Sequence, residues 1–273
     1  MINRLALHVR IAFHYCAQAL KMNMEYRLDF FVECLAALAM QYTKVLTLQF
    51  LFEKFHSMRD REMRVWSEYE VFFIFGFSLL PMGFFSAFAM NFYQFSDKYL
   101  VGGELDRLLM RPLSSLFQLI MEGIAFDFLP DLGLGVAIIV YTWPHLGTQF
   151  SPLLLLQMGW AVLGAWCVLT GVFLVLISLS FWSQDRLSIL PPVYNLLNFA
   201  QFPLTIYKPV VQILLTWVVP FGFAAFYPAS GFLANNSAFR TFALLSPLAG
   251  IVCLTAGILT WRAGMRRYSG AGT

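Results

Sequence analysis

Between two long apolar segments the chain reads Gly102-Gly103-Glu104-Leu105-Asp106-Arg107-Leu108-Leu109-Met110-Arg111-Pro112. The two glycines end the preceding element, and the proline stops the helix that follows them. The acidic residues lie in the first turn of that helix and the arginines lie toward its last turn, as the helix dipole favours. The leucines follow the i, i+3, i+4 spacing and give the helix one apolar face. We therefore predict a short, capped, charged helix that lies on a surface.

The composition around this stretch is that of an integral membrane protein. Of 273 residues, 59% are hydrophobic and 12% are charged, against about 25% charged in an average soluble domain. The apolar residues gather in stretches long enough to cross ~30 Å of hydrocarbon, which takes about 20 helical residues. The alternating pattern of a membrane β-barrel is absent from the sequence. We predict an all-α, polytopic membrane protein.

We expect a single transmembrane domain over residues 1–273 with six helical spans. They are 28–52, 71–95, 119–141, 153–179, 209–226 and 241–261. Residues 1–27 mix basic and apolar positions and predict an amphipathic helix along the inner leaflet. The segment 188–207 is apolar but broken by prolines, and we interpret it as interfacial or half-inserted.

Orientation follows from the distribution of Lys and Arg. Most of them fall on the side that holds both termini and the 102–112 helix, and this side is expected to be cytoplasmic. The predicted location is a bacterial-type cytoplasmic (inner) membrane, which the chain crosses several times.

The chain lacks the motifs of an enzyme that would supply its own energy. None of its lysines follows a glycine, so the Gly-Lys-Ser/Thr loop that binds nucleotide phosphates is missing. No Gly-x-Ser-x-Gly elbow and no paired-histidine zinc motif is present either. We expect a non-enzymatic chain that binds no cofactor or metal of its own and takes energy from a partner.

Ionisable residues within apolar spans are candidates for function because burying them in lipid is costly. Glu33, Asp127 and Asp131 are candidate polar residues of a translocation path. Lys44 also lies within the first span, and we expect it, like Glu33, to extend toward an interface. Asp127 and Asp131 share a helix face at i, i+4, a spacing that magnesium-dependent prenyl transferases use, although Pro130 distorts the helix between them.

Two alternatives to transport remain open at this point. The first is an intramembrane transferase that acts on a lipid-linked substrate, with the two aspartates holding a metal. The second is a non-catalytic membrane scaffold. A polar lining of a water-filled vestibule accounts better for the aspartates, since no Lys or Arg lies nearby to hold a phosphate.

Further landmarks occur in order along the chain: Trp66-Ser67, Glu70, Gly76, Asn91, the 103–112 stretch, Phe181-Trp182, Phe202-Pro203-Leu204, Tyr207, Pro220-Phe221 and Tyr227-Pro228. With these landmarks the chain, from about Met24 to Trp261, resembles the ABC type-2 permease family, specifically its six-span branch of exporter membrane subunits. In that family the loop between spans two and three is a coupling helix that seats in a groove of the ATP-binding subunit. The resemblance implies these contact residues: Glu104, Leu105, Asp106, Arg107, Leu108 and Arg111.

The resemblance also implies a function and partners. The chain would be the permease subunit of an exporter that moves an amphipathic substrate, with ATP and Mg bound by a separate subunit. A second permease subunit, identical or related, and membrane lipid would complete the assembly, and no nucleic acid is involved. The abundance of Phe does not select a substrate.

Overall fold

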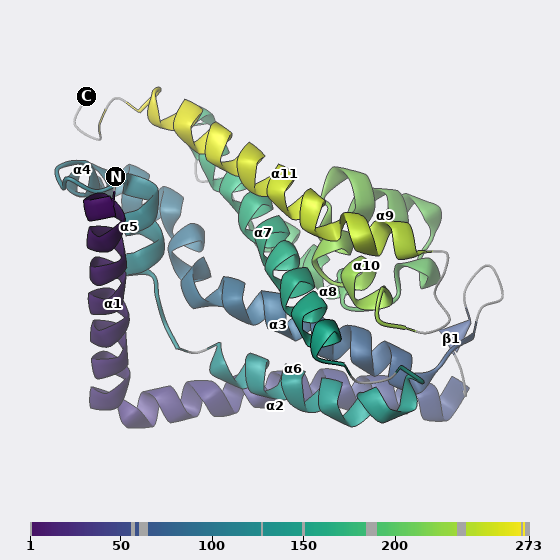
Figure 1. Ribbon diagram of the computed structural model, residues 1–273. Coiled ribbons are helices and arrows are strands. Elements are labelled where there is room, and N and C mark those ends of the chain that lie inside the picture. Colours follow the sequence, from purple (N-terminus) through teal and green to yellow (C-terminus); the bar gives the residue numbers. More distant parts are fainter. Residues whose placement is uncertain are drawn as a thin grey trace.

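The computed structural model describes residues 2–55, 58–59, 65–126, 128–148, 151–183, 190–233, 239–268 and 270, and they are almost entirely helical (Figure 1). The first part holds α1 (Ile2–Glu25), α2 (Arg27–Phe55), the short strands β1 (Met58–Arg59) and β2 (Val65–Trp66), α3 (Glu68–Tyr93), the π-helix η1 (Phe95–Val101) and α4 (Glu104–Leu109). The middle part holds α5 (Ser115–Glu122), α6 (Leu129–Thr142), the 3-10 turn η2 (Trp143–His145) and α7 (Pro152–Ser183). The last part holds α8 (Leu190–Ala200), η3 (Leu204–Ile206), α9 (Pro209–Ile213), the π-turn η4 (Leu214–Val218), η5 (Phe221–Ala224), α10 (Phe226–Ser230) and α11 (Arg240–Met265).

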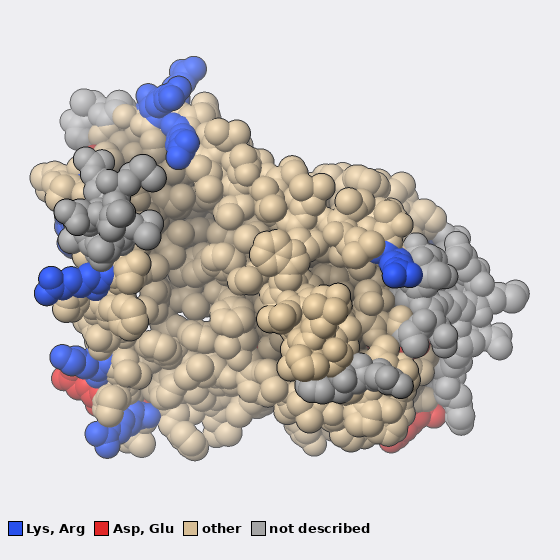
Figure 2. All heavy atoms as spheres, in the orientation of Figure 1, with Lys and Arg blue, Asp and Glu red and all other residues tan. Residues whose placement is uncertain are grey.

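Four helices in the described part of the chain are long and apolar enough to cross a membrane. They are Arg27–Phe50 within α2, together with α3, α7 and α11, and they correspond to the first, second, fourth and sixth predicted spans. Charged side chains lie at the two ends of the long axis of the molecule, and the visible surface between them is uncharged (Figure 2). The structure thus confirms an all-α protein of membrane type, while the number of six spans stays a prediction.

The third predicted span, 119–141, is not one helix. It is divided into α5 and α6, and the chain leaves the helix at Gly123, where a Cβ atom would lie 2.7 Å from the Asn91 side chain. Pro130 lies in the first turn of α6. The 14 residues of α6 rise only ~21 Å, less than the hydrocarbon thickness. A crossing at this place therefore needs both pieces.

The fifth predicted span, 209–226, also differs from a single helix. α9 and η4 run to Val218, and the chain then reverses at Val219 and Pro220 into η5 and α10. The returning arm contacts the first one, since the Thr216 and Tyr227 hydroxyls lie 2.8 Å apart. The reversal has a local cause, because proline has no N–H to continue a helix.

The segment 188–207 contains a helix, α8. Two hydrogen bonds hold the end of this segment against α3 and against Trp66 ahead of it. Gln201 Nε2 donates to the sulfur of Met82, near the middle of α3, at 3.0 Å. Trp66 Nε1, just before α3 begins, donates to Thr205 Oγ1 at 3.1 Å. From residue 201 to residue 205 the chain therefore runs along α3 toward the N-terminal end of that helix. The sequence alone indicates an interfacial or half-inserted segment at 188–207 and does not predict this direction.

α1 is the predicted N-terminal helix, and it turns sharply into α2 at Tyr26 (Figure 1). Its His8 ring packs edge-on against Phe117 of α5, with ring centroids 5.0 Å apart. The apolar residues Val9 and Phe13 remain exposed. This is the arrangement that an amphipathic helix on a lipid surface requires, and the inner leaflet as its location stays a prediction.

α7 and α11 pack backbone against backbone through glycines spaced seven residues apart. A Cβ atom at Gly164 would lie 2.7 Å from Pro247 Cα, and one at Gly257 would lie 2.8 Å from the carbonyl oxygen of Gly171. A Cβ atom at Gly171 would overlap the backbone of Cys253. Small residues permit this close approach between helices in lipid, where no hydrophobic force drives them together.

Replacing Gly171 by Leu is expected to destabilise the protein by roughly 3 kcal/mol or more, because the obstructing atoms are backbone and cannot rotate away. The measurement is the temperature at which the monodisperse peak in detergent is lost on size-exclusion chromatography. Gly159→Leu on the same helix is the control, since no heavy atom lies within 4 Å of a Cβ there. Equal loss in both variants would contradict the role assigned to the close contact.

Candidate functional site

α4 is held to the rest of the chain by one face. Gly103 before it has φ +72°, a left-handed conformation that glycine adopts without strain. Leu105 and Leu108 are fully buried, whereas Leu109 is 48% and Met110 81% exposed. The predicted short helix is present, and its apolar residues divide into two that anchor it and two that face outward.

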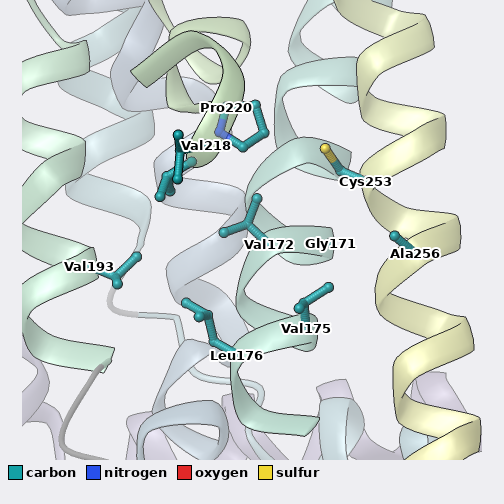
Figure 3. A pocket seen from close by; sticks show the side chains of 10 residues that line it. Gly171, Val172, Val175, Leu176, Val193, Val218, Pro220, Cys253 and Ala256 are labelled. Atoms are coloured by element: carbon teal, nitrogen blue, oxygen red, sulfur yellow. The ribbon is translucent and has the colours of Figure 1, made fainter. Parts of the chain in front are cut away.

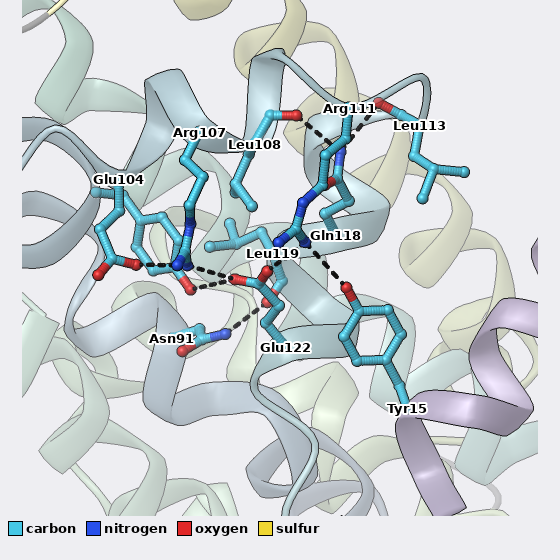
Figure 4. Close-up of polar contacts among 11 residues, drawn as sticks. Tyr15, Asn91, Glu104, Arg107, Leu108, Arg111, Leu113, Gln118, Leu119 and Glu122 are labelled. Atoms are coloured by element: carbon cyan, nitrogen blue, oxygen red, sulfur yellow. Dashed lines mark hydrogen bonds and ion pairs between the residues drawn. The ribbon is translucent and has the colours of Figure 1, made fainter. Parts of the chain in front are cut away.

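A network of ion pairs surrounds α4 (Figure 4). Arg107 Nη2 lies 3.0 Å from Glu104 Oε2 and 3.8 Å from Glu122 Oε2. Arg111 Nη1 lies 2.9 Å from Glu122 Oε1 and donates to the Tyr15 hydroxyl at 3.3 Å. The Glu122 side chain is only 15% exposed. One carboxylate at the end of α5 therefore holds both arginines, and α1 joins the network through Tyr15.

Tyr99 of η1 completes this network. Its hydroxyl donates to Glu122 Oε2 at 3.5 Å. Burial raises the pKa of Tyr99 well above its usual value, and the carboxylates of Glu122 and Glu104 raise it further. The phenol therefore stays neutral at physiological pH and remains a hydrogen-bond donor to the carboxylate.

Two side-chain amides tie the backbone of this region together (Figure 4). Gln118 Nε2 donates to the carbonyls of Leu108 and Leu113 at 2.9 and 3.1 Å. Asn91 Nδ2 of α3 donates to the carbonyl of Leu119 at 2.7 Å. These bonds join the end of α4 to α5, and α5 to the long helix α3.

The structure separates the six residues that the family resemblance singled out. Glu104, Arg107 and Arg111 belong to the ion network. Leu105 and Leu108 are buried within the chain and fix α4 against it, and their contact with a partner stays a prediction. The carboxylate of Asp106, partly buried, lies beside the backbone of Gly270 near the C-terminus.

Sequence reasoning missed Glu122 as a member of this site. In the sequence it is an acidic residue at the start of an apolar segment, with no motif around it that indicates a role. Its spacing of eleven residues from Arg111 carried no signal, because the pairing depends on the turn at 110–114.

A second polar cluster lies at membrane depth. Gln41 Nε2 of α2 donates to Asp131 Oδ1 of α6 at 3.0 Å. Lys44 Nζ donates to Asn198 Oδ1 at 3.2 Å and to Gln201 Oε1 at 3.3 Å. Lys44 therefore turns inward to α8, and the sequence-based expectation that it extends toward an interface is wrong.

The other two membrane candidates do not join this cluster. Glu33 is exposed on α2, and Asp127 lies outside the described residues, so its position relative to Asp131 stays untested. Within the described ranges no group of three His, Cys, Asp or Glu side chains is arranged to hold a metal ion. The Asp131 carboxylate is engaged with an amide instead.

An apolar cavity of about 240 Å³ lies between α7, α8, the 218–220 turn and α11 (Figure 3). Its walls include Val172, Val193, Pro220 and Cys253. The lining offers no charged or amide group, so the cavity suits hydrocarbon only.

A comparison with known protein families gives a match over most of the chain. A family model described as "ABC-2 family transporter protein" matches residues 38–272. Neither the curated proteins nor the solved structures gave a match to this chain. The matched region includes α4, the polar cluster at α2 and the ion network around α4 except Tyr15. The chain belongs to the ABC-2 family of transporter membrane proteins.

Proposed function

We propose that this ABC-2 permease is the membrane subunit of an exporter, that a separate subunit binds ATP and Mg, and that α4 is the coupling helix that docks on this subunit. The observation that supports the proposal is that one side of α4 is held by the chain while the other side is exposed. One side is fixed by buried leucines and by Glu122, and the other side presents exposed apolar and basic groups.

The exposed side of α4 suits a protein partner. Met110 and Leu109 offer apolar area, and the Arg107 and Arg111 side chains are 53% and 41% exposed. Arginine and methionine are enriched at protein interfaces. α4 lies at the same end of the molecule as α1 and both termini (Figure 1), the end that the positive-inside rule assigns to the cytoplasm.

The fixed side of α4 supplies a mechanical link. Closure of two ATP-binding subunits would pull on α4, and the Gln118 and Asn91 bonds would carry the movement into α5 and α3. Rigid-body movement of packed helices is an established way to alternate access between the two sides of a membrane. Export of an amphipathic substrate is the direction that the family resemblance favours.

A single chain leaves much of its membrane helices uncovered, which supports a second permease subunit, identical or related. The apolar window of α2 is only 6% buried and that of α11 is 17% buried, against 72% for α3. Lipid and a second subunit together would cover these faces. Family membership favours this assembly over the transferase and scaffold alternatives.

Purification of the tagged chain from its native membranes is expected to recover an ATP-binding protein. Met110→Asp should reduce this recovery about tenfold, because a charge placed in an apolar contact costs on the order of 1.4 kcal/mol or more. Immunoblotting or mass spectrometry of the bound fraction measures the ratio of the two proteins.

Met110→Leu is the matched control, since it keeps an apolar side chain at the same exposed position. Full recovery of the ATP-binding protein with Met110→Asp, or its consistent absence from the wild-type preparation, would refute docking at α4.

Glu122→Gln is expected to uncouple ATP hydrolysis from transport. It removes the charge that holds both Arg107 and Arg111, and residues along such a link change coupling by about 0.5–2 kcal/mol, roughly two- to thirtyfold. The measured quantity is substrate moved per ATP hydrolysed in proteoliposomes of the whole transporter. Glu68→Gln serves as the control, because Glu68 is exposed at the start of α3 and outside the ion network, and an equal ratio in the two variants would contradict the role of Glu122.

A further inference from the structure

The polar cluster at α2 lies near the middle of that long apolar helix. Gln41 is the central residue of α2, about 21 Å from either end of that helix. Met82, which accepts a hydrogen bond from Gln201, is likewise near the middle of α3. We define the α2 polar group by the members that these bonds connect: Gln41, Lys44, Asp131, Asn198 and Gln201.

Stability does not account for two charged residues at this depth. Among the described residues no carboxylate lies within ion-pair distance of Lys44, which is held by neutral amide oxygens, and Asp131 accepts a hydrogen bond from the Gln41 amide. Lys44 and Asp131 attract each other electrostatically but do not close on one another as an ion pair. Ionisable groups at membrane depth are costly and mark paths for substrates. Apolar residues in place of buried charges often raise stability. The charges therefore point to a ligand.

The group has hydrogen-bonding capacity that the protein leaves unused. The ammonium of Lys44 has three donors, and two of them meet Asn198 and Gln201. The Asp131 carboxylate accepts one bond from Gln41 and retains further acceptor sites. Gln41 Oε1 is buried and has no hydrogen-bond partner. If the amide were flipped, its oxygen would face the Asp131 carboxylate and the two acceptors would repel each other. Asp131 therefore fixes the orientation in which Gln41 Oε1 is the atom without a hydrogen bond.

The unused hydrogen-bond donors and acceptors of the α2 polar group indicate which ligand chemistry fits it. A phosphate or carboxylate would suit Lys44 and be repelled by Asp131, while a cation would suit Asp131 and be repelled by Lys44. A hydroxyl group both donates and accepts, so it can accept from Lys44 and donate to Asp131 or to Gln41 Oε1. The surrounding surface of α2 is apolar and exposed, as at Met40 and Leu46, and would accommodate a hydrocarbon tail.

We propose that the α2 polar group binds the uncharged, hydroxylated headgroup of an amphipathic substrate, such as a glycosyl or glycerol group on an apolar tail. The proposal rests on the proposed transport function and names its substrate class. Lys44 and Asp131 bind the two ends of the headgroup, and Gln41 orients Asp131.

The test measures binding to the purified full-length chain in lipid nanodiscs, without ATP or a partner subunit. The probe is radiolabelled dodecyl maltoside below its micellar concentration, with empty nanodiscs as blank. We expect saturable binding that unlabelled dodecyl maltoside displaces. Dodecyl phosphate and dodecyltrimethylammonium, which have the same tail and opposite charges, should require at least tenfold higher concentrations.

Two variants test the residues. Gln41→Leu and Lys44→Met should each weaken maltoside binding about tenfold or more, whereas Thr47→Val should leave it unchanged. Thr47 is an exposed polar residue of the same helix whose hydroxyl donates to the carbonyl of Thr43. Size-exclusion profiles identify variants that fail to fold, and Gln41→Leu, which changes only a neutral side chain, keeps the test valid if Lys44→Met does not fold.

Several results would overturn the proposal. They are binding that does not saturate, binding unchanged in the Gln41 variant, and tighter binding of either charged amphiphile. The outcome is independent of the docking experiment at α4. Recovery of an ATP-binding protein without maltoside binding refutes the substrate class alone, and maltoside binding without such a partner refutes ATP-driven transport alone.

Discussion

The backbone contact between α7 and α11 supports the rest of this protein. Lipid tails are as apolar as leucine, so helices in a bilayer gain little from apolar side chains and associate through close packing. Gly164, Gly171, Gly250 and Gly257 remove the side chains from the contact and let the carbonyl of one helix lie against the Cα of the other. With this pair fixed, α3 packs on the other side of α7, where Phe85 meets Phe173 with ring centroids 4.7 Å apart. α3 in turn carries Asn91, which holds the α5 region.

The broken third span joins the two polar sites. Glu122, which holds the arginines around α4, ends α5, and Asp131 of the α2 polar group lies in the first turn of α6. Only the short connection between the two helices separates them. A helix interrupted at this place can change the angle between its halves without losing backbone hydrogen bonds in lipid, provided that protein surrounds the break. The interruption thus gives the proposed movement of α4 a route toward the proposed headgroup site.

The sequence predicted well what depends on local length and composition. The spans at 28–52, 71–95, 153–179 and 241–261 correspond to long helices, because an uninterrupted apolar stretch of that length has few alternatives in a membrane. The prediction was poorer at 119–141 and 209–226. In these two segments the apolar content is similar, but the helices end near Gly123 and Pro220. A hydropathy average over the segment does not detect where a helix is interrupted.

What the sequence by itself determined is the membrane class, the four long helices and the limits of α4, since glycine, proline and the apolar spacing act within a few residues. Only the tertiary structure decided which polar groups meet. Gln41 and Asp131 are 90 positions apart, and Lys44 bonds to residues 154 and 157 positions away. The type of a polar residue determines whether it can donate or accept a hydrogen bond. Which partner it meets is decided only when the chain folds.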